Sequence, residues 1–160
     1  MIELNQPVPD FSAPSTSNRL FKLSEHQGQN VVIYFYPKDN TPGCTTESQN
    51  FRDFYDEFQA LNTIIVGVSR DSLRSHENFK AKHQLPFELI ADPDETLSRA
   101  FDVIKLKSLY GKQYLGIERS TFLIDAAGIL RREWRKVRVP EHVESVLVAV
   151  QSLPTLIKNE

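Results

Sequence analysis

The 160-residue sequence contains one cysteine, Cys44, one methionine and one tryptophan. A lone cysteine cannot form an internal disulfide, so the chain is not a disulfide-stapled secreted scaffold, and a reducing compartment is its expected setting. No stretch approaches the roughly 20 apolar residues that span a membrane. The N-terminus lacks the basic start and apolar run of a signal peptide. We therefore expect a cytoplasmic protein that is neither exported nor inserted into a membrane.

The sequence also lacks an excess of either charge. Its 19 Lys and Arg residues nearly balance 21 Asp and Glu residues, which gives a net charge of −2. Neither nucleic acid nor an anionic membrane is therefore an expected partner. In the basic run 131-RREWRKVR-138, basic and other residues alternate, which predicts a hairpin strand with one solvent-exposed basic face.

Several motifs are absent. The sequence has neither the Gly-rich loops that bind nucleotides nor the Gly-x-Ser-x-Gly of hydrolases. It also has no Cys-x-x-Cys, which excludes a dithiol oxidoreductase of the usual kind. His76 and His83 are seven residues apart, whereas a zinc-protease helix needs four, so we predict a solvated helix face for them. His26 and His142 are expected in loops or at the surface, and no cofactor or metal is expected.

What the sequence does contain is a set of strand-like and helix-like segments. The near-continuous apolar runs 31–36, 63–69 and 120–125 predict strands covered on both faces. A turn at 125–128 predicts a hairpin with 129–134, and 88–91 predicts a short strand. Apolar residues at helical spacing and capping residues predict four helices, over 44–61, 72–83, 94–101 and from Pro140 onwards.

This order of elements predicts the fold class. Strand and helix alternation gives parallel neighbours, and the late hairpin adds antiparallel ones, so the class is α/β with a mixed central sheet flanked by helices. The length suits one domain over residues 1–160. The first 30 residues are expected to form a small β appendage.

Cys44 lies at the expected start of the first helix, directly after a strand and a turn that contains Pro42 and Gly43. Helix N-termini present free N–H groups and the positive end of the dipole, both of which favour a thiolate. A lone cysteine can instead be a buried apolar filler. The polar neighbours Thr41 and Thr45 favour a reactive thiol.

The segment 37-PKDNTPGC-44 matches the Pro-x-x-x-Thr-x-x-Cys signature of peroxiredoxins. YFYPKDNTPGCTTE followed by FRD resembles the subfamily called bacterioferritin comigratory protein, or peroxiredoxin Q. Further segments resemble it in order and spacing, namely an early PDF, 66-VGVSRDS-72, 75-SHENFKAKHQLPF-87, LIADPD and 119-RSTFLID-125. The resemblance covers nearly the whole chain. It implies a thioredoxin-like fold and a thiol-dependent peroxidase of antioxidant defence and redox homeostasis.

The resemblance also implies roles for individual residues. Cys44 would be the peroxidatic cysteine, which attacks the O–O bond of a peroxide and becomes a sulfenic acid. Thr41 would hydrogen-bond the peroxide and the thiolate, and Pro37 would shield the sulfenic acid from solvent. Arg119 would stabilise the thiolate and the transition state, a role that suits the fixed donors and charge of a guanidinium. Glu47 either orients Arg119, takes part in proton handling, or is a solvated carboxylate favoured by the helix dipole.

The sequence departs from the subfamily where a second, resolving cysteine is expected. Many members carry it five residues after the first cysteine and others in the next helix, where this chain has Gln49 and approximately Lys80. A cycle within one chain is therefore excluded. The sulfenic acid must react with an outside thiol of glutathione, glutaredoxin, thioredoxin or a second molecule. We predict a 1-Cys mechanism on hydrogen peroxide and organic hydroperoxides, and the resemblance implies a monomer.

A second hypothesis is a non-catalytic protein of the same fold, a redox-sensing or holdase-type interaction module. Its cysteine would be modified once and would not turn over. The rate of oxidation separates the two, because a peroxidase loses its thiol to peroxide many orders of magnitude faster than free cysteine does.

Overall fold

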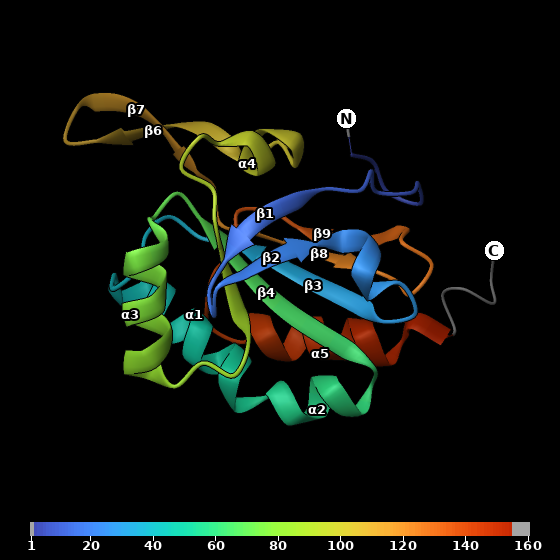
Figure 1. Cartoon of the computed structure of the whole chain (residues 1–160). Coiled ribbons are helices and arrows are strands. Elements are labelled where there is room, and N and C mark those ends of the chain that lie inside the picture. The colour runs from blue at the N-terminus through green and yellow to red at the C-terminus, as the bar shows by residue number, and fades with distance from the viewer. Residues whose placement is uncertain (1, 155–160) are drawn as a thin grey trace.

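The computed structural model describes residues 2–154. Seven strands form one sheet, and two further strands form a separate hairpin (Figure 1). In order across the sheet, the seven strands are β2 (Arg19–Lys22), β1 (Ser12–Ser15), β5 (Glu88–Ala91), β4 (Thr63–Ser69), β3 (Asn30–Phe35), β8 (Ser120–Ile124) and β9 (Leu130–Trp134). β3, β4 and β5 are parallel to one another, whereas β8 and β9 on one side and β1 and β2 on the other pair antiparallel. The predicted mixed sheet is confirmed.

The central strand β3 is buried on both faces, as its apolar run predicts. Val32 and Tyr34 pack into one core cluster, and the alternate residues Val31, Ile33 and Phe35 pack into another. The first cluster joins the sheet to α1 (Pro42–Asp53), α2 (Tyr55–Ala60), α3 (Leu73–His83) and α5 (His142–Gln151). The second cluster lies under the N-terminal segment and α4 (Thr96–Ala100). In Figure 1 these two groups of elements lie on opposite sides of the sheet.

The first predicted helix is wrong in its extent. Instead of one helix over 44–61, α1 ends at Asp53, Phe54 takes a non-helical conformation, and α2 begins at Tyr55. The break turns α2 along β4, so that Phe51 and Phe58 are both fully buried with ring centroids 6.1 Å apart. Phe54 and Tyr55, whose spacing would place them on the same helix face as Phe51 and Phe58, are only half-buried.

The remaining predicted helices are confirmed with small shifts of their ends. The Ser72 hydroxyl caps α3 by accepting a hydrogen bond from the Ser75 N–H at 3.2 Å. α4 is shorter than the predicted 94–101, and α5 begins two residues after Pro140. None of the helices in residues 2–154 is long and apolar enough to cross a membrane.

Three hairpins, β1–β2, β8–β9 and that of β6 (Ile104–Leu109) with β7 (Lys112–Ile117), complete the described part of the chain. The β1–β2 hairpin, expected as an appendage, extends the main sheet, because Ser15 pairs with Ile90 of β5. The turn before β9 has Gly128 at φ +85°, and the Asp125 carboxylate accepts hydrogen bonds from two backbone N–H groups in it. The β6–β7 hairpin was not predicted, and it projects away from the body in Figure 1.

Candidate active site

Cys44 is the third residue of α1, and the helix begins where the strand β3 and its following loop end. Thr41 is the N-cap residue, and its carbonyl accepts the first helical hydrogen bond from the Thr45 N–H at 2.9 Å. Pro42 has no N–H, so the N–H groups of Gly43 and Cys44 are the remaining donors of the first turn that the helix cannot satisfy. Cys44 is 1% exposed. The thiol is therefore buried, yet it stands at the positive end of a helix.

The Arg119 guanidinium lies against this thiol. Its Nη2 donates to the Cys44 Sγ at 3.3 Å, and its Nη1 donates to the Glu47 Oε1 at 2.7 Å. Arg119 directly precedes β8, whose Ser120 pairs with Phe35 at the end of β3, so sheet pairing brings it to the loop before α1. A Cβ on Gly43 would stand 3.3 Å from the Arg119 Nη2, so the glycine leaves room for the guanidinium. The structure thus brings together three of the five predicted residues.

Glu47 is fully buried, so the alternative of a solvated carboxylate is wrong. Its Oε1 pairs with Arg119, and its Oε2 has no hydrogen-bond partner among the described residues. Burial raises the Glu47 pKa to about 7, against the opposing pull of the Arg119 charge. Burial alone would lower the Arg119 pKa, but the negative charges of Glu47 and Cys44 outweigh it and raise that pKa. Arg119 therefore stays charged beside the sulfur.

Thr41 and Pro37 border the same loop. The Thr41 hydroxyl donates to the Lys38 carbonyl at 2.7 Å, so its proton is already engaged. The oxygen lone pairs remain available as acceptors. Pro37 is half-buried and follows the fully buried Tyr36.

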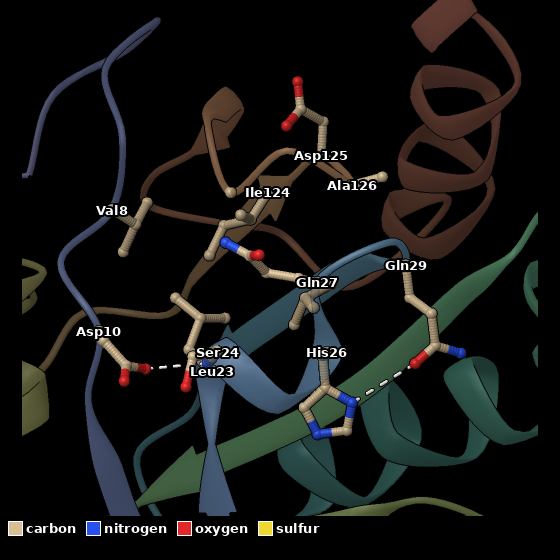
Figure 2. A pocket seen from close by; sticks show the side chains of 12 residues that line it. Val8, Asp10, Leu23, Ser24, His26, Gln27, Gln29, Ile124, Asp125 and Ala126 are labelled. Carbon is tan, nitrogen blue, oxygen red and sulfur yellow. Dashed lines mark hydrogen bonds between the residues drawn. The ribbon is translucent and has the colours of Figure 1, made fainter.

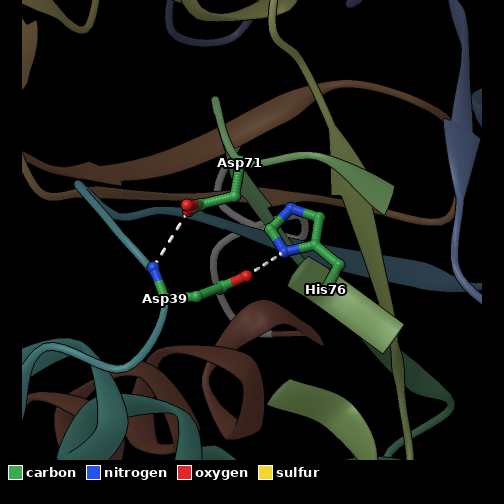
Figure 3. A group of neighbouring side chains, drawn as sticks. All are labelled: Asp39, Asp71 and His76. Atoms are coloured by element: carbon green, nitrogen blue, oxygen red, sulfur yellow. Dashed lines mark hydrogen bonds and ion pairs between the residues drawn. The ribbon is translucent and has the colours of Figure 1, made fainter. Parts of the chain in front are cut away.

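A network of carboxylates, hydroxyls and a histidine holds this loop, and no sequence pattern predicted it. The Asp39 carboxylate accepts hydrogen bonds from the Tyr36 hydroxyl at 2.6 Å and from the Ser75 hydroxyl at 2.8 Å. It also lies 2.7 Å from the His76 Nδ1 (Figure 3). The Asp39 N–H donates to the Asp71 carboxylate at 2.9 Å. These contacts tie the loop before α1 to the start of α3.

His76 is fully buried, which overturns the predicted solvated helix face. Its Nε2 lies 2.9 Å from the Ile90 carbonyl, and its Nδ1 faces the Asp39 carboxylate. His76 is therefore held between the Ile90 carbonyl and the buried Asp39 carboxylate. Burial raises the Asp39 pKa, but the hydrogen bond and charge of His76 outweigh burial and lower it. With Asp71 these groups are close enough to hold a cation, but both ring nitrogens of His76 already face partners within the protein.

We expect His76→Asn to lower the free energy of unfolding by about 3 kcal/mol, because it leaves the buried Asp39 carboxylate without its His76 partner. Urea unfolding at neutral pH measures this. Asn78→Ala, on the exposed side of the same helix, is the control and should change stability by less than about 0.5 kcal/mol. Equal stability of the His76 variant and the wild type would refute the buried ion pair.

His142 is also buried, against the prediction of a surface position. Its Nε2 lies 2.8 Å from the Thr121 hydroxyl, and its ring packs edge-on against Phe51 and Trp134. Burial, and then the charge of Arg119, lowers the His142 pKa from 6.5 to about 4. The unfolded chain therefore binds this proton more readily than the folded one. The stability contribution is complete above pH 6.5 and is lost as the pH falls through about 4.

Between pH 7 and pH 5 this linkage predicts that the wild type loses about 2 kcal/mol more stability than His142→Gln. Glu47, whose pKa is raised, acts in the opposite sense, because its contribution is lost as the pH rises through about 7. Glu47 is common to both proteins, so the difference between them isolates His142. Urea unfolding at the two pH values is the measurement, and parallel pH profiles would contradict the assignment.

The two positions at which subfamily members carry a resolving cysteine lie on neighbouring helices in this chain. Gln49 is half-buried in α1, and its side-chain nitrogen is 3.4 Å from the His83 Nδ1 of α3. Lys80 forms an ion pair with Glu88. Gln49 thus links α1 to α3, and Lys80 links α3 to β5.

A separate pocket lies elsewhere on the molecule. Val8, Ser24, His26 and Asp125 are among the residues that line it, between the N-terminal segment and the turn after β8 (Figure 2). Neither Cys44 nor Arg119 lines this pocket. It is therefore distinct from the thiol site.

The chain is similar to known proteins over most of its length. Residues 4–133 match the sequence pattern of the AhpC/TSA family. The chain is 55% identical to Peroxiredoxin Bcp of Xanthomonas campestris pv. campestris over 152 residues, which cover 95% of each protein. It is 50% identical to Peroxiredoxin Bcp of Bacillus subtilis over 152 residues, which cover 95% of this chain and 97% of that protein.

A solved structure of Xanthomonas campestris bacterioferritin comigratory protein is similar to the present fold. It superposes with a TM-score of 0.85 at 49% identity and covers 89% of this chain and 90% of its own. That structure was described in connection with alkyl peroxide reduction and trapped intermediate and ligand complexes.

Proposed function

The chain belongs to the AhpC/TSA family, within its Bcp or PrxQ group of peroxiredoxins, and on this premise we propose that Cys44 is its peroxidatic cysteine. The protein is a thiol-dependent peroxidase with a thioredoxin-like fold. The observation that carries the residue assignment is the Arg119 guanidinium, which joins the Cys44 sulfur to the buried Glu47 at the start of α1. The hypothesis of a non-catalytic module is set aside.

The first step is nucleophilic. The Cys44 thiolate attacks one peroxide oxygen, an S–O bond forms, and the O–O bond breaks. The electron pair of that bond leaves with the second oxygen, which takes up a proton and departs as water or an alcohol. Cys44 is oxidised to a sulfenic acid as the peroxide is reduced.

Arg119 and the helix N-terminus provide positive charge where this step needs it. The guanidinium at 3.3 Å stabilises negative charge on the sulfur, and its remaining N–H groups can hold a peroxide oxygen as charge develops. The free N–H groups of Gly43 and Cys44 add the positive end of the helix dipole. Both effects act before the peroxide arrives, so little reorganisation accompanies the reaction.

Thr41, Pro37 and Glu47 act around this centre in the proposal. The Thr41 hydroxyl donates its proton in a hydrogen bond to the Lys38 carbonyl, so its oxygen can accept a hydrogen bond from the protonated peroxide oxygen. Pro37 covers the loop side of the site and limits access of water to the sulfenic acid. Glu47 positions Arg119 through the 2.7 Å ion pair, and with a pKa of about 7 it can exchange a proton near neutral pH.

Recycling in this proposal uses an external thiol, because the chain has no second cysteine. The outside thiolate attacks the Cys44 sulfenic sulfur, a mixed disulfide forms, and hydroxide leaves as water after protonation. A second thiol then attacks the partner's sulfur and releases the Cys44 thiolate. The thiol comes from thioredoxin, glutaredoxin, glutathione or a second copy.

We also propose that the chain acts as a single-domain monomer in the cytoplasm and reduces both hydrogen peroxide and organic hydroperoxides. Support comes from the lone cysteine and from the subfamily resemblance. The test is a steady-state assay in which purified protein and either peroxide are combined with thioredoxin, with glutaredoxin and glutathione, or with dithiothreitol. Sustained peroxide consumption with at least one reductant is expected. One turnover per molecule with every reductant would contradict the proposal.

A further inference from the structure

The β6–β7 hairpin carries an unusual share of exposed apolar side chains. Nine large apolar side chains are exposed on the described part of the chain, and five of them lie on this hairpin and its turn, namely Leu106, Leu109, Tyr110, Tyr114 and Leu115. Tyr110 at the tip is 96% exposed. The hairpin stands away from the main sheet in Figure 1. Exposed apolar groups gathered on one projecting element are typical of an interaction surface.

The strand register divides these residues between two faces. Leu106 lies opposite Leu115 on one face. Lys107 lies opposite Tyr114 and Leu109 opposite Lys112, which places these four residues on the other face because side chains alternate along a strand. We call this second set the lysine face.

The hairpin adjoins the thiol site, because β7 ends at Ile117 and Arg119, two residues later, donates a hydrogen bond to the Cys44 Sγ. Lys107 is half-buried, and its pKa is lowered by burial and then by the charge of Arg119, while the charge of Cys44 acts in the opposite direction. Lys107 is therefore within electrostatic reach of both active-site groups. Arg70 also donates to the Leu115 carbonyl at 3.4 Å. A molecule bound on this hairpin would therefore stand near Arg119 and the Cys44 thiol that it contacts.

Charge and size narrow the choice of occupant. Residues 103–117 contain three lysines and no acidic residue. Contact between two copies through this face would set lysines against lysines, and juxtaposed like charges oppose association. Glutathione is too small to cover side chains spread along the hairpin. The surface suits a larger, acidic and partly apolar partner.

We propose that the lysine face is the docking surface for a protein reductant whose reactive thiol lies in an apolar patch with an acidic rim. The inference rests on the proposed function, because it supplies the external thiol that attacks the Cys44 sulfenic acid. In that exchange the partner's thiol and Cys44 form a disulfide as water leaves. A second thiol of the partner then releases Cys44 and leaves the partner as a disulfide.

The test compares Leu109→Ser, Tyr114→Ser and Lys112→Glu with the wild type, using thioredoxin and glutaredoxin as protein reductants and dithiothreitol as a small one. We expect Tyr114→Ser to raise the KM for the protein reductant that supports turnover by about tenfold, because truncation of an aromatic residue buried in an interface weakens binding by about that much. Lys112→Glu should slow association and weaken its dependence on salt. Rates with dithiothreitol should not change.

Leu106→Ser, on the opposite face of the same hairpin, is the matched control and should leave the KM for the protein reductant unchanged. Equal losses in this control and the lysine-face variants would overturn the proposal, as would unchanged KM values in all variants or turnover with glutathione alone. Dimers in sedimentation that the lysine-face variants disrupt would assign the face to a second copy and overturn it as well. Oxidation of Cys44 by peroxide is measured separately in every variant. If peroxide did not oxidise Cys44, the proposed function would be wrong. If peroxide oxidised Cys44 but the KM values did not change, only the docking surface would be wrong.

Discussion

Replacing Cys44 with serine is expected to reduce peroxidase turnover to the rate of the buffer, a loss of about a thousandfold or more. A serine hydroxyl is ionised far less readily than a thiol and cannot form a sulfenic acid. The chain contains no other cysteine that could substitute. Peroxide consumption with dithiothreitol as reductant measures the effect.

The Cys44 variant must be shown to fold, since Cys44 is buried in the main core cluster. Serine is similar in size to cysteine, so thermal unfolding should remain cooperative. Thr45→Ser, one residue further along α1, is a control that should retain turnover. Full peroxidase turnover by a folded Cys44→Ser protein would be incompatible with the assignment.

Arg119→Gln is expected to slow oxidation of Cys44 by about 10²- to 10³-fold. The variant removes the guanidinium that lies 3.3 Å from the sulfur, and with it the charge that stabilises both the thiolate and the departing oxygen. Arg119→Lys should retain part of the rate, because an ammonium keeps the charge but loses the fixed pair of donors. Stopped-flow mixing of the reduced protein with peroxide gives the rate directly.

Glu47→Gln separates chemistry from folding in this experiment. Arg119→Gln leaves the buried Glu47 carboxylate unpaired, which should cost about 3 kcal/mol of stability. Adding Glu47→Gln removes that buried charge, so the double variant should regain stability but remain slow. If the double variant regained the rate as well, Arg119 would be a structural residue only.

Much of the fold is readable from local patterns in the sequence. The runs 31–36, 63–69 and 120–125 became β3, β4 and β8 because strands covered on both faces need apolar residues at every position. Ser72 capped α3, and Gly128 formed its turn, because these are local effects of one side chain or one backbone angle. Patterns that a single element creates are therefore predictable.

Features that depend on contacts between distant segments were not readable. The break at Phe54 follows from packing of two helices on the sheet, and helical spacing alone continues across it. The β6–β7 hairpin combines lysines with apolar residues on exposed faces, so it lacks the alternation of a half-buried strand. Nothing in the local sequence around His76 and His142 indicates their burial, which depends on contacts across the fold. His76 lies between the Asp39 carboxylate and the Ile90 carbonyl, and His142 lies against the Thr121 hydroxyl.

The site divides in the same way. The helix start identifies Cys44 as a candidate from its neighbours, whereas the approach of Arg119 requires the pairing of β8 with β3. Burial of Glu47 likewise depends on α1 packing against the sheet, so the sequence left its role open. The resemblance to peroxiredoxins supplied Arg119 as an expectation, and the fold brings it to the sulfur and pairs it with Glu47.

The most direct test of a reactive thiol at Cys44 is the fate of its sulfur when the fully reduced protein meets one equivalent of peroxide. Stopped-flow kinetics should show loss of the thiol many orders of magnitude faster than for free cysteine. Mass spectrometry with dimedone should place a single sulfenic acid adduct on Cys44 with no disulfide inside the chain. A thiol that reacts no faster than free cysteine, or a Cys44 that dimedone never labels, would contradict this account.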